Sequence, residues 1–218
     1  MTVEDVIQKI HEVGIVPVVR AANLDEARRA VDAICTGGIP VIEITMTVPN
    51  APAMIQELVR HYRNSVLTGA GTVTTAEQAK VCLDAGAQFL VSPGLSVPVL
   101  QAAAKRGVLA MPGAFTPTEL MSALEAGAKI IKIFPCGSAG GAKHIKALRG
   151  PFPDTRLIPT GGVNLTNAAE YFAAGAFALG VGADLVDLAA LRRNEPAKII
   201  EMAKALIEAV RLARAKNS

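Results

Sequence analysis

The sequence has few aromatic residues and few of the side chains that most often bind metal ions. Aromatic residues make up 4% of the 218 residues, and tryptophan is absent. There are only three histidines, His11, His61 and His144, and each belongs to a helix-like stretch rather than to the end of an apolar segment. The three cysteines lack the Cys-x-x-Cys spacing that is common in zinc sites. We therefore expect neither a bound metal nor any other cofactor.

Long apolar runs and an excess of charge of one sign are also lacking. The longest apolar run, Tyr171 to Ala183, has 13 residues, which is too short to cross a membrane. The 22 basic and 19 acidic residues are mixed along the chain and leave a net charge of +3, so no basic stripe for nucleic acid is present. The amino-terminal stretch MTVEDVIQKIHEVG carries charges where a signal peptide needs an apolar core. These absences, with an odd number of cysteines, favour a cytoplasmic protein with neither a nucleic-acid nor a membrane partner.

What the chain does contain is a repeated pattern of a helix end, a glycine or asparagine, and an apolar segment. Successive units begin 20 to 26 residues apart, which is about one strand, one helix and two short loops. Amphipathic stretches separate the apolar segments, and one of them, TPTELMSALEA, opens with the Thr and Glu spacing of a capping box. The residues that lead the eight units are Gly14, Gly38, Asn64, Gly86, Gly107, Gly127, Gly150 and Gly175. We expect each to end a helix in the left-handed conformation.

Eight strand–helix units in one compact chain predict an α/β fold, a (β/α)8 TIM barrel that forms a single domain over residues 1–218. An open, doubly wound sheet is the alternative. It has less support, because GAGTVT at 69–74 is not a GxGxxG turn and no Walker lysine follows a glycine-rich loop. Residues 2–13 and 195–214 predict two extra helices outside the barrel, the first of which could close its bottom.

Two ionisable residues lie inside apolar strands, where they are unusual. Lys132 is in IIKIFP, and Glu43 is in VIEIT. Because side chains alternate along a strand, flanking isoleucines that pack on the helices direct both Lys132 and Glu43 into the barrel. The pair could be a structural ion pair. The interpretation that we favour is an imine-forming lysine, with Glu43 as its acid and base and without a metal.

The segments PTGGVN at 159–164 and GVGADL at 180–185 supply a second pattern. Their glycines would allow backbone N–H groups to approach an anion at the ends of the last two strands, beside Thr160. Phosphate is the anion that barrels commonly bind there, and tight turns without a ligand are the alternative.

The order of several short motifs along the chain resembles a known enzyme family. The motifs are IEIT, GAGTV, VSPGL, MPG, TPTEL, KIFP, GPFP and PTGGV. In this order they are similar to those of the 2-keto-3-deoxy-6-phosphogluconate (KDPG) and 4-hydroxy-2-oxoglutarate (KHG) aldolase family. The resemblance implies a homotrimeric class I aldolase that cleaves a phosphorylated keto sugar acid to pyruvate and glyceraldehyde 3-phosphate. It implies that Lys132 forms the imine, that Glu43 is the acid and base, and that Thr72 holds the pyruvate carboxylate. The further positions that it implies are Pro93 and Phe134 as pocket walls, and Gly161, Gly162 and Gly182 at the phosphate.

Two positions depart from this pattern. Thr47 stands where an arginine can bind the carboxylate, and Ala183 stands where a serine can help to bind phosphate. We keep both as candidate substrate contacts and expect Arg20, at the end of VPVVR, to supply the missing cation for the carboxylate. The phosphate is the other anion that Arg20 could reach. An isomerase or synthase that forms no imine, and a binding protein without activity, stay as alternatives, and the preferred sugar-acid epimer or shorter keto acid is open.

Overall fold

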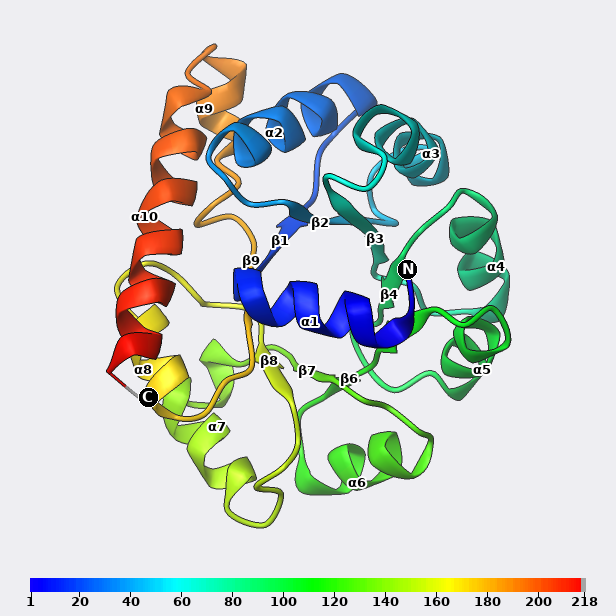
Figure 1. Cartoon of the computed structure of the whole chain (residues 1–218), viewed down its shortest axis with the longest axis vertical. Coiled ribbons are helices and arrows are strands. Elements are labelled where there is room, and N and C mark those ends of the chain that lie inside the picture. Colours follow the sequence, from blue (N-terminus) through cyan, green and yellow to red (C-terminus); the bar gives the residue numbers. More distant parts are fainter. Residues whose placement is uncertain (217–218) are drawn as a thin grey trace.

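The computed structural model describes residues 1–216 and shows parallel strands surrounded by helices (Figure 1). Six strands form one sheet in the order β5-β4-β3-β2-β1-β9, and three form a second in the order β6-β7-β8. The strands are β1 Ile15–Val19, β2 Val41–Thr45, β3 Leu67–Gly71, β4 Phe89–Val91, β5 Leu109–Met111, β6 Gly113–Ala114, β7 Ile131–Ile133, β8 Leu157–Pro159 and β9 Leu179–Val181. Their near-continuous apolar sequences fit a parallel sheet that is buried on both faces.

Ten α-helices lie around these strands in the described part of the chain. They are α1 Val3–Val13, α2 Leu24–Thr36, α3 Ala51–Tyr62, α4 Ala76–Asp84, α5 Val97–Lys105, α6 Pro117–Glu125, α7 Ala142–Arg149, α8 Ala168–Ala173, α9 Leu188–Arg192 and α10 Ala197–Ala215. The predicted capping box is present at α6, where Thr116 and Glu119 each bond to the other's backbone N–H. Both predicted extra helices are found as α1 and α10.

The predicted fifth strand is divided, which corrects one detail of the expected eight-strand pattern. Pro112 lies between β5 and β6, and proline has no N–H to donate to a sheet. Its carbonyl oxygen still accepts a bond from the N–H of Lys132, at 2.9 Å. At the other junction of the two sheets, Thr160 forms an isolated parallel bridge with Gly180. The result is an α/β fold whose parallel sheet curls around a central core.

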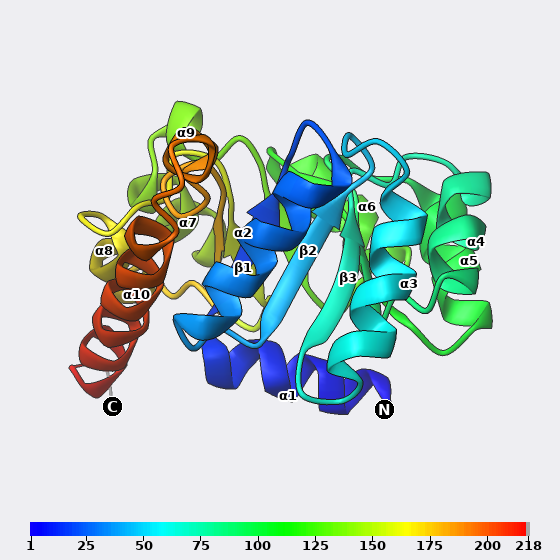
Figure 2. The same cartoon turned by 90° about the horizontal axis from the view of Figure 1, so that it is seen from above.

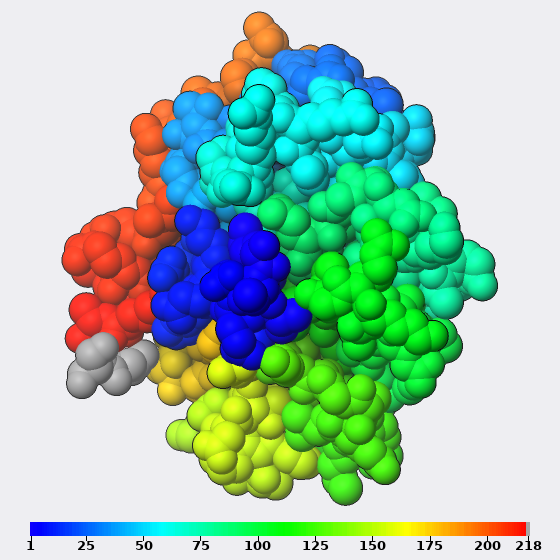
Figure 3. Space-filling view, turned by 45° about the vertical axis from the view of Figure 1, so that its right-hand side comes forward, coloured from blue at the N-terminus to red at the C-terminus, as the bar shows by residue number. Residues whose placement is uncertain are grey.

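Helix α1 packs across the amino ends of the strands. Its buried residues Val6, Ile7 and Ile10 belong to one cluster with inward side chains from the beginnings of the strands, including Val41 and Leu67. Figure 2 shows α1 beneath the strands, and Figure 3 shows it in the middle of the molecular face that it covers. The expectation that the first helix closes this end is therefore met by the packing.

The glycine pattern is confirmed at six of the eight positions. Gly14, Gly38, Gly86, Gly107, Gly127 and Gly175 all have positive φ values. Asn64 was also predicted to be left-handed, but it has no positive φ. The preceding residue, Arg63, has φ 50° and ψ −118°, which is not the left-handed helical conformation. The prediction was also wrong for Gly150, whose backbone is in the right-handed conformation, with φ −54°. Residues 1–216 contain no helix that is both long and apolar enough to span a membrane.

Candidate active site

Lys132 on β7 and Glu43 on β2 lie together inside the curled sheet, as the alternation of their strands predicts. Their exposed fractions are 4% and 2%. Lys132 Nζ is 3.9 Å from Glu43 Oε1. Ile131 and Ile133, which flank Lys132, belong instead to the cluster between the sheet and the helices. Two residues that are 89 positions apart in the chain thus bring an amine and a carboxyl group together in the buried interior.

The environment of Glu43 favours a carboxyl group that can hold a proton. Burial raises its pKa, while the charges of Lys132 and Arg20 act in the opposite direction without cancelling the effect. Oxygen Oε1 is buried and accepts no hydrogen bond from any described residue. A buried acceptor without a partner is costly in a purely structural role, so it is available to a water or a substrate hydroxyl.

A small cavity lies next to this pair. Its polar lining consists of Lys132, Glu43 and Thr160, and its apolar lining residues are Val16, Val91, Met111, Ile158 and the backbone of Gly180. The ring of Phe134 is 5.2 Å from Lys132 Nζ and lies on the same side of β7. The amine of Lys132 therefore faces apolar walls, one carboxyl group and one hydroxyl group.

Two strand glycines make room for the polar side chains of this cavity. A Cβ atom at Gly71 would overlap the carboxylate of Glu43, and a Cβ atom at Gly180 would overlap the side chain of Thr160. Neither contact was predicted from the sequence. The available signal was the presence of glycines inside β3 (LTGAG) and β9 (LGV).

Thr72 and Thr47, the two predicted carboxylate contacts, differ in their local structure. Thr72 follows β3 with φ 58°, an unusual conformation for a β-branched residue and one that is found most often at functional sites. The hydroxyl of Thr45 donates to the carbonyl of Val19 at 3.1 Å and lies 2.6 Å from the hydroxyl of Thr47. Because the only hydroxyl hydrogen of Thr45 is used on Val19, Thr47 is the donor to Thr45. The Thr47 hydroxyl can then only accept a further bond, which does not suit a carboxylate.

The predicted anion-binding glycines lie in two loops at the carboxyl ends of β8 and β9. Gly161 and Gly162 have φ values of 87° and 78°, a conformation that few other residues adopt. Among the hydrogen bonds of residues 1–216, none uses the backbone N–H of Gly161, Gly162, Gly182 or Ala183 as donor. A Cβ atom at Gly182 would meet no atom within 4 Å. Helices α8 and α9 begin only at Ala168 and Leu188, so these groups belong to the loops and not to the helix ends.

The remaining predicted residues lie at the same end of the strands. Arg20 is exposed after β1, and its charge reaches Glu43. The backbone of Pro93 lies against Gly113, which pairs with Lys132 in the sheet. Gly161 lies against the ring of Phe134, and Ala183 is exposed.

The part of the chain that the structure describes has no cluster of side chains suited to bind a metal ion. It contains no group of three or more His, Cys, Asp or Glu side chains placed to hold an ion. His11, His61 and His144 lie on α1, α3 and α7, as predicted.

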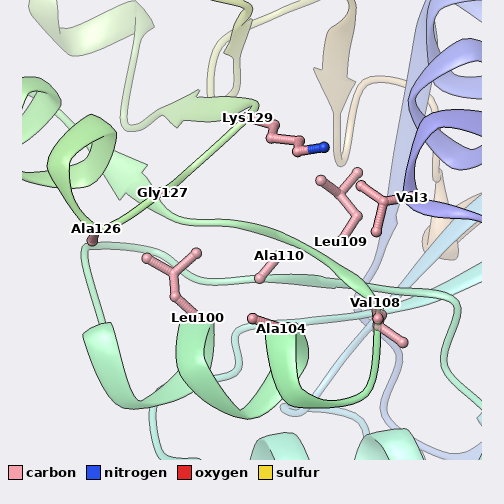
Figure 4. Close-up of a pocket in the computed structure, with 10 residues that line it drawn as sticks. Val3, Leu100, Ala104, Val108, Leu109, Ala110, Ala126, Gly127 and Lys129 are labelled. Carbon is pink, nitrogen blue, oxygen red and sulfur yellow. The ribbon is translucent and has the colours of Figure 1, made fainter.

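A second hollow, of about 150 Å³, shares no lining residue with the cavity beside Lys132 (Figure 4). It is lined by Val3 of α1, Leu100 and Ala104 of α5, and Lys129, which precedes β7. The Lys129 amine is bonded to Glu4 at 2.6 Å, and the other lining residues are apolar or glycine. This hollow therefore offers no reactive group comparable to Lys132.

Comparison with known proteins agrees with this geometry. Residues 6–202 match the family of KDPG and KHG aldolases. The chain belongs to this family. Among its relatives is the KHG/KDPG aldolase of Escherichia coli strain K12, with 34% identity over 198 residues, which cover 91% of this chain and 92% of that protein. The 2-dehydro-3-deoxy-6-phosphogalactonate aldolase of the same strain is 37% identical over 172 residues, which cover 78% of this chain and 83% of that protein.

A solved structure of the family also matches over almost its whole length. The KDPG aldolase of Legionella pneumophila, with pyruvate captured at low pH as a covalent carbinolamine intermediate, has a TM-score of 0.85 and 32% identity to this chain. The match covers 92% of this chain and 97% of that one. Membership of the family confirms the resemblance that the sequence motifs indicate.

Proposed function

We propose that the protein is a class I aldolase that cleaves a 2-keto-3-deoxy-6-phospho sugar acid to pyruvate and glyceraldehyde 3-phosphate. The cleavage of 4-hydroxy-2-oxoglutarate to pyruvate and glyoxylate is a second reaction open to the same site. The observation that carries the proposal is the buried Lys132 amine, 3.9 Å from a buried carboxyl group whose Oε1 atom has no hydrogen-bond partner among the described residues. Family membership supports the same chemistry.

The proposed reaction begins when the neutral amine of Lys132 attacks the ketone carbon of the substrate. Protonation of the ketone oxygen gives a carbinolamine, and a second proton lets that oxygen leave as water, so that a cationic imine forms. Glu43 supplies and removes protons in these steps, because burial raises its pKa and so favours a carboxyl group that can hold a proton and release it.

Carbon–carbon cleavage follows from the imine. Glu43, as carboxylate, removes the proton of the C4 hydroxyl group, the C3–C4 bond breaks, and its electron pair is taken up by the imine to give an enamine. The aldehyde leaves. Protonation of the enamine at C3 and addition of water then release pyruvate and restore the Lys132 amine.

We assign the two anionic ends of the substrate to different loops. Arg20 and the strained segment at Thr72 would hold the carboxylate, since the Thr47 hydroxyl is committed as a donor to Thr45. The phosphate would be held by loop N–H groups that have no other acceptor among the described residues, with Thr160 beside them. The positions of this second set are Gly161, Gly162, Gly182 and Ala183, and Pro93 and Phe134 would form the walls between the two ends.

The remaining proposals concern architecture and surroundings. We propose that residues 1–218 form one domain and that the two sheets act as a single closed (β/α)8 barrel. Support comes from the Thr160–Gly180 bridge at one junction and from chain continuity through Pro112 at the other. Three free cysteines support a reducing, cytoplasmic location. A homotrimer is proposed from the family resemblance.

The test is reduction with borohydride in the presence of pyruvate, followed by mass measurement and peptide mapping. One reduced pyruvyl unit is expected on Lys132, and Lys132→Met should remove both the adduct and the release of pyruvate from phosphorylated substrates. Lys129→Met is the matched control, because Lys129 lies three residues earlier and is half exposed in its pair with Glu4. An adduct on another lysine would overturn the assignment of the imine to Lys132. The absence of any adduct would favour an isomerase or synthase that forms no imine. Assays with both sugar-acid epimers and with 4-hydroxy-2-oxoglutarate would identify the substrate.

A further inference from the structure

Glu26 is a buried acid outside the cavity, and both of its carboxylate oxygens are used. It lies on α2, with an exposed fraction of 6%. Oε2 accepts the backbone N–H of Ala22 at 2.7 Å, and Oε1 accepts Nε of Arg192 at 2.7 Å. Burial alone would raise the pKa of Glu26, but these bonds outweigh it and the pKa is lowered. The group is therefore held as a carboxylate at neutral pH.

One partner of Glu26 lies in the loop assigned to the substrate carboxylate, and the other lies at the end of the helix that follows a loop assigned to the phosphate. Ala22 is two residues after Arg20, in the loop that follows β1. Arg192 is the last residue of α9, the helix that follows the loop of Gly182 and Ala183. Arg29, one turn after Glu26 on α2, also holds α9 through a 2.7 Å bond to the carbonyl of Leu191.

A helix cap would explain only half of this arrangement. Asn23 already caps α2 by accepting the N–H of Glu26 at 2.9 Å, and the bond that the N–H of Ala22 donates to Glu26 completes the local turn. The bond to Arg192 joins residues 166 positions apart and has no part in capping. It connects the loop after β1 to the segment after β9, two strands that are neighbours in the sheet.

We propose that Glu26, through Arg192, is a positioning residue that fixes the distance between the carboxylate-binding and phosphate-binding groups of the site. The role rests on the proposed function. A phosphorylated keto acid contacts both groups and depends on their separation, whereas pyruvate contacts only the first. Loss of the link therefore weakens binding of the long substrate without weakening imine formation by pyruvate.

The experiment compares Arg192→Met and Glu26→Gln with wild type. Arg192→Met removes the link and leaves the bond that the N–H of Ala22 donates to Glu26. Glu26→Gln keeps a neutral acceptor for Ala22 and loses the charge. Arg28→Met is the matched control, since it breaks an ion pair of 2.6 Å to Glu57 between the same helix and α3. For both test variants, the KM of the phosphorylated substrate should rise about five- to thirtyfold, with kcat within about threefold.

Pyruvate trapping by borohydride should stay close to wild type in all three variants, and Arg192→Lys should recover part of the loss in KM. An unchanged KM in both test variants, even with a lower melting temperature, would overturn the positioning role and leave Glu26 a structural residue. An equal loss of pyruvate trapping in both would also overturn it, because the link would then support the carboxylate site alone. A wild-type protein that forms no pyruvate adduct would overturn the proposed function and this role with it.

Discussion

The carboxylate of Glu43 occupies the space in which a side chain at Gly71 would begin. The two residues lie on neighbouring strands, and β2 and β3 are paired over five residues from Val41–Leu67 to Thr45–Gly71. The position of the proposed acid and base is thus set by the absence of a side chain on the adjacent strand, as well as by the strand that carries it.

Gly71→Ala should therefore displace the Glu43 carboxylate and reduce kcat by about 10- to 100-fold, as small displacements of reacting groups do. The backbone of Gly71 is not in the left-handed region, so alanine is allowed there apart from this contact. A double-mutant cycle with Glu43→Ala is the measurement. The effect of Gly71→Ala should disappear when Glu43 is already absent, and an effect of equal size in that background would show that the glycine acts on something else.

Glu43→Gln should keep the fold, since glutamine is nearly the same size and removes a buried charge. Some pyruvate adduct should still form on Lys132, but turnover should fall by about two to four orders of magnitude, because a positioned acid and base is lost. Steady-state rates and borohydride trapping on the same preparation measure the two effects separately. Near-normal turnover would mean that another group moves the proton.

Arg20→Met should weaken pyruvate trapping by an amount that corresponds to roughly 1.5–3 kcal/mol, the usual contribution of a hydrogen bond to a charged group. Pyruvate is the decisive ligand because it has a carboxylate and no phosphate. The concentration of pyruvate that gives half-maximal trapping is the quantity to measure. Unchanged trapping with a higher KM for the phosphorylated substrate would move Arg20 to the phosphate end.

Gly182→Val probes the phosphate end with little risk to the fold, because a Cβ atom there meets open space and the residue has no positive φ. Inorganic phosphate should compete with the phosphorylated substrate in the wild type. The valine side chain should raise the inhibition constant of phosphate about tenfold or more by blocking its approach to the loop N–H groups, while pyruvate trapping stays normal. Equal inhibition of both proteins by phosphate would exclude this loop.

His11 should make the protein less stable in mild acid. Burial lowers the pKa of His11, and the charges of Arg214 and Arg156 act in the same direction, against a smaller opposing effect of Glu12. Because the folded pKa lies below the ordinary value of 6.5, the unfolded chain binds the proton more readily. The contribution of neutral His11 is present above that value and is lost as the pH falls below it.

Urea unfolding between pH 8 and pH 5 measures this effect. His11→Gln should have a shallower loss of stability on the acid side than wild type. The same measurement on His61→Gln, at a histidine that packs on Tyr62 of α3, shows how much of the change is common to any exchange of histidine for glutamine.

The parts of this protein that were predictable from sequence are those that depend on local periodicity. Two-residue alternation in IIKIFP and VIEIT was enough to place Lys132 and Glu43 on the inner side of the sheet, because the flanking isoleucines need the helix side. The helix–glycine pattern similarly located the units of the fold. It failed at Asn64, which has no positive φ, whereas Arg63 before it has φ 50° and ψ −118°.

Relationships between distant residues could not be obtained in this way. The sequence does not show that the Thr47 hydroxyl donates to Thr45, because that direction depends on the Val19 carbonyl of the next strand. The bond between Glu26 and Arg192 and the fit of Glu43 beside Gly71 likewise depend on the three-dimensional arrangement. Periodicity tells which face a side chain is on, whereas its partners are set by packing.

Helix α1 has a consequence for the order in which products leave. It covers the amino ends of the strands, so in the proposed barrel reactants enter and leave only at the opposite end. In the proposed mechanism the aldehyde departs while pyruvate is still bonded to Lys132, and pyruvate can follow only after hydrolysis. Release is thus ordered, with pyruvate last. Pyruvate should then inhibit competitively against the keto acid, and the aldehyde should inhibit noncompetitively.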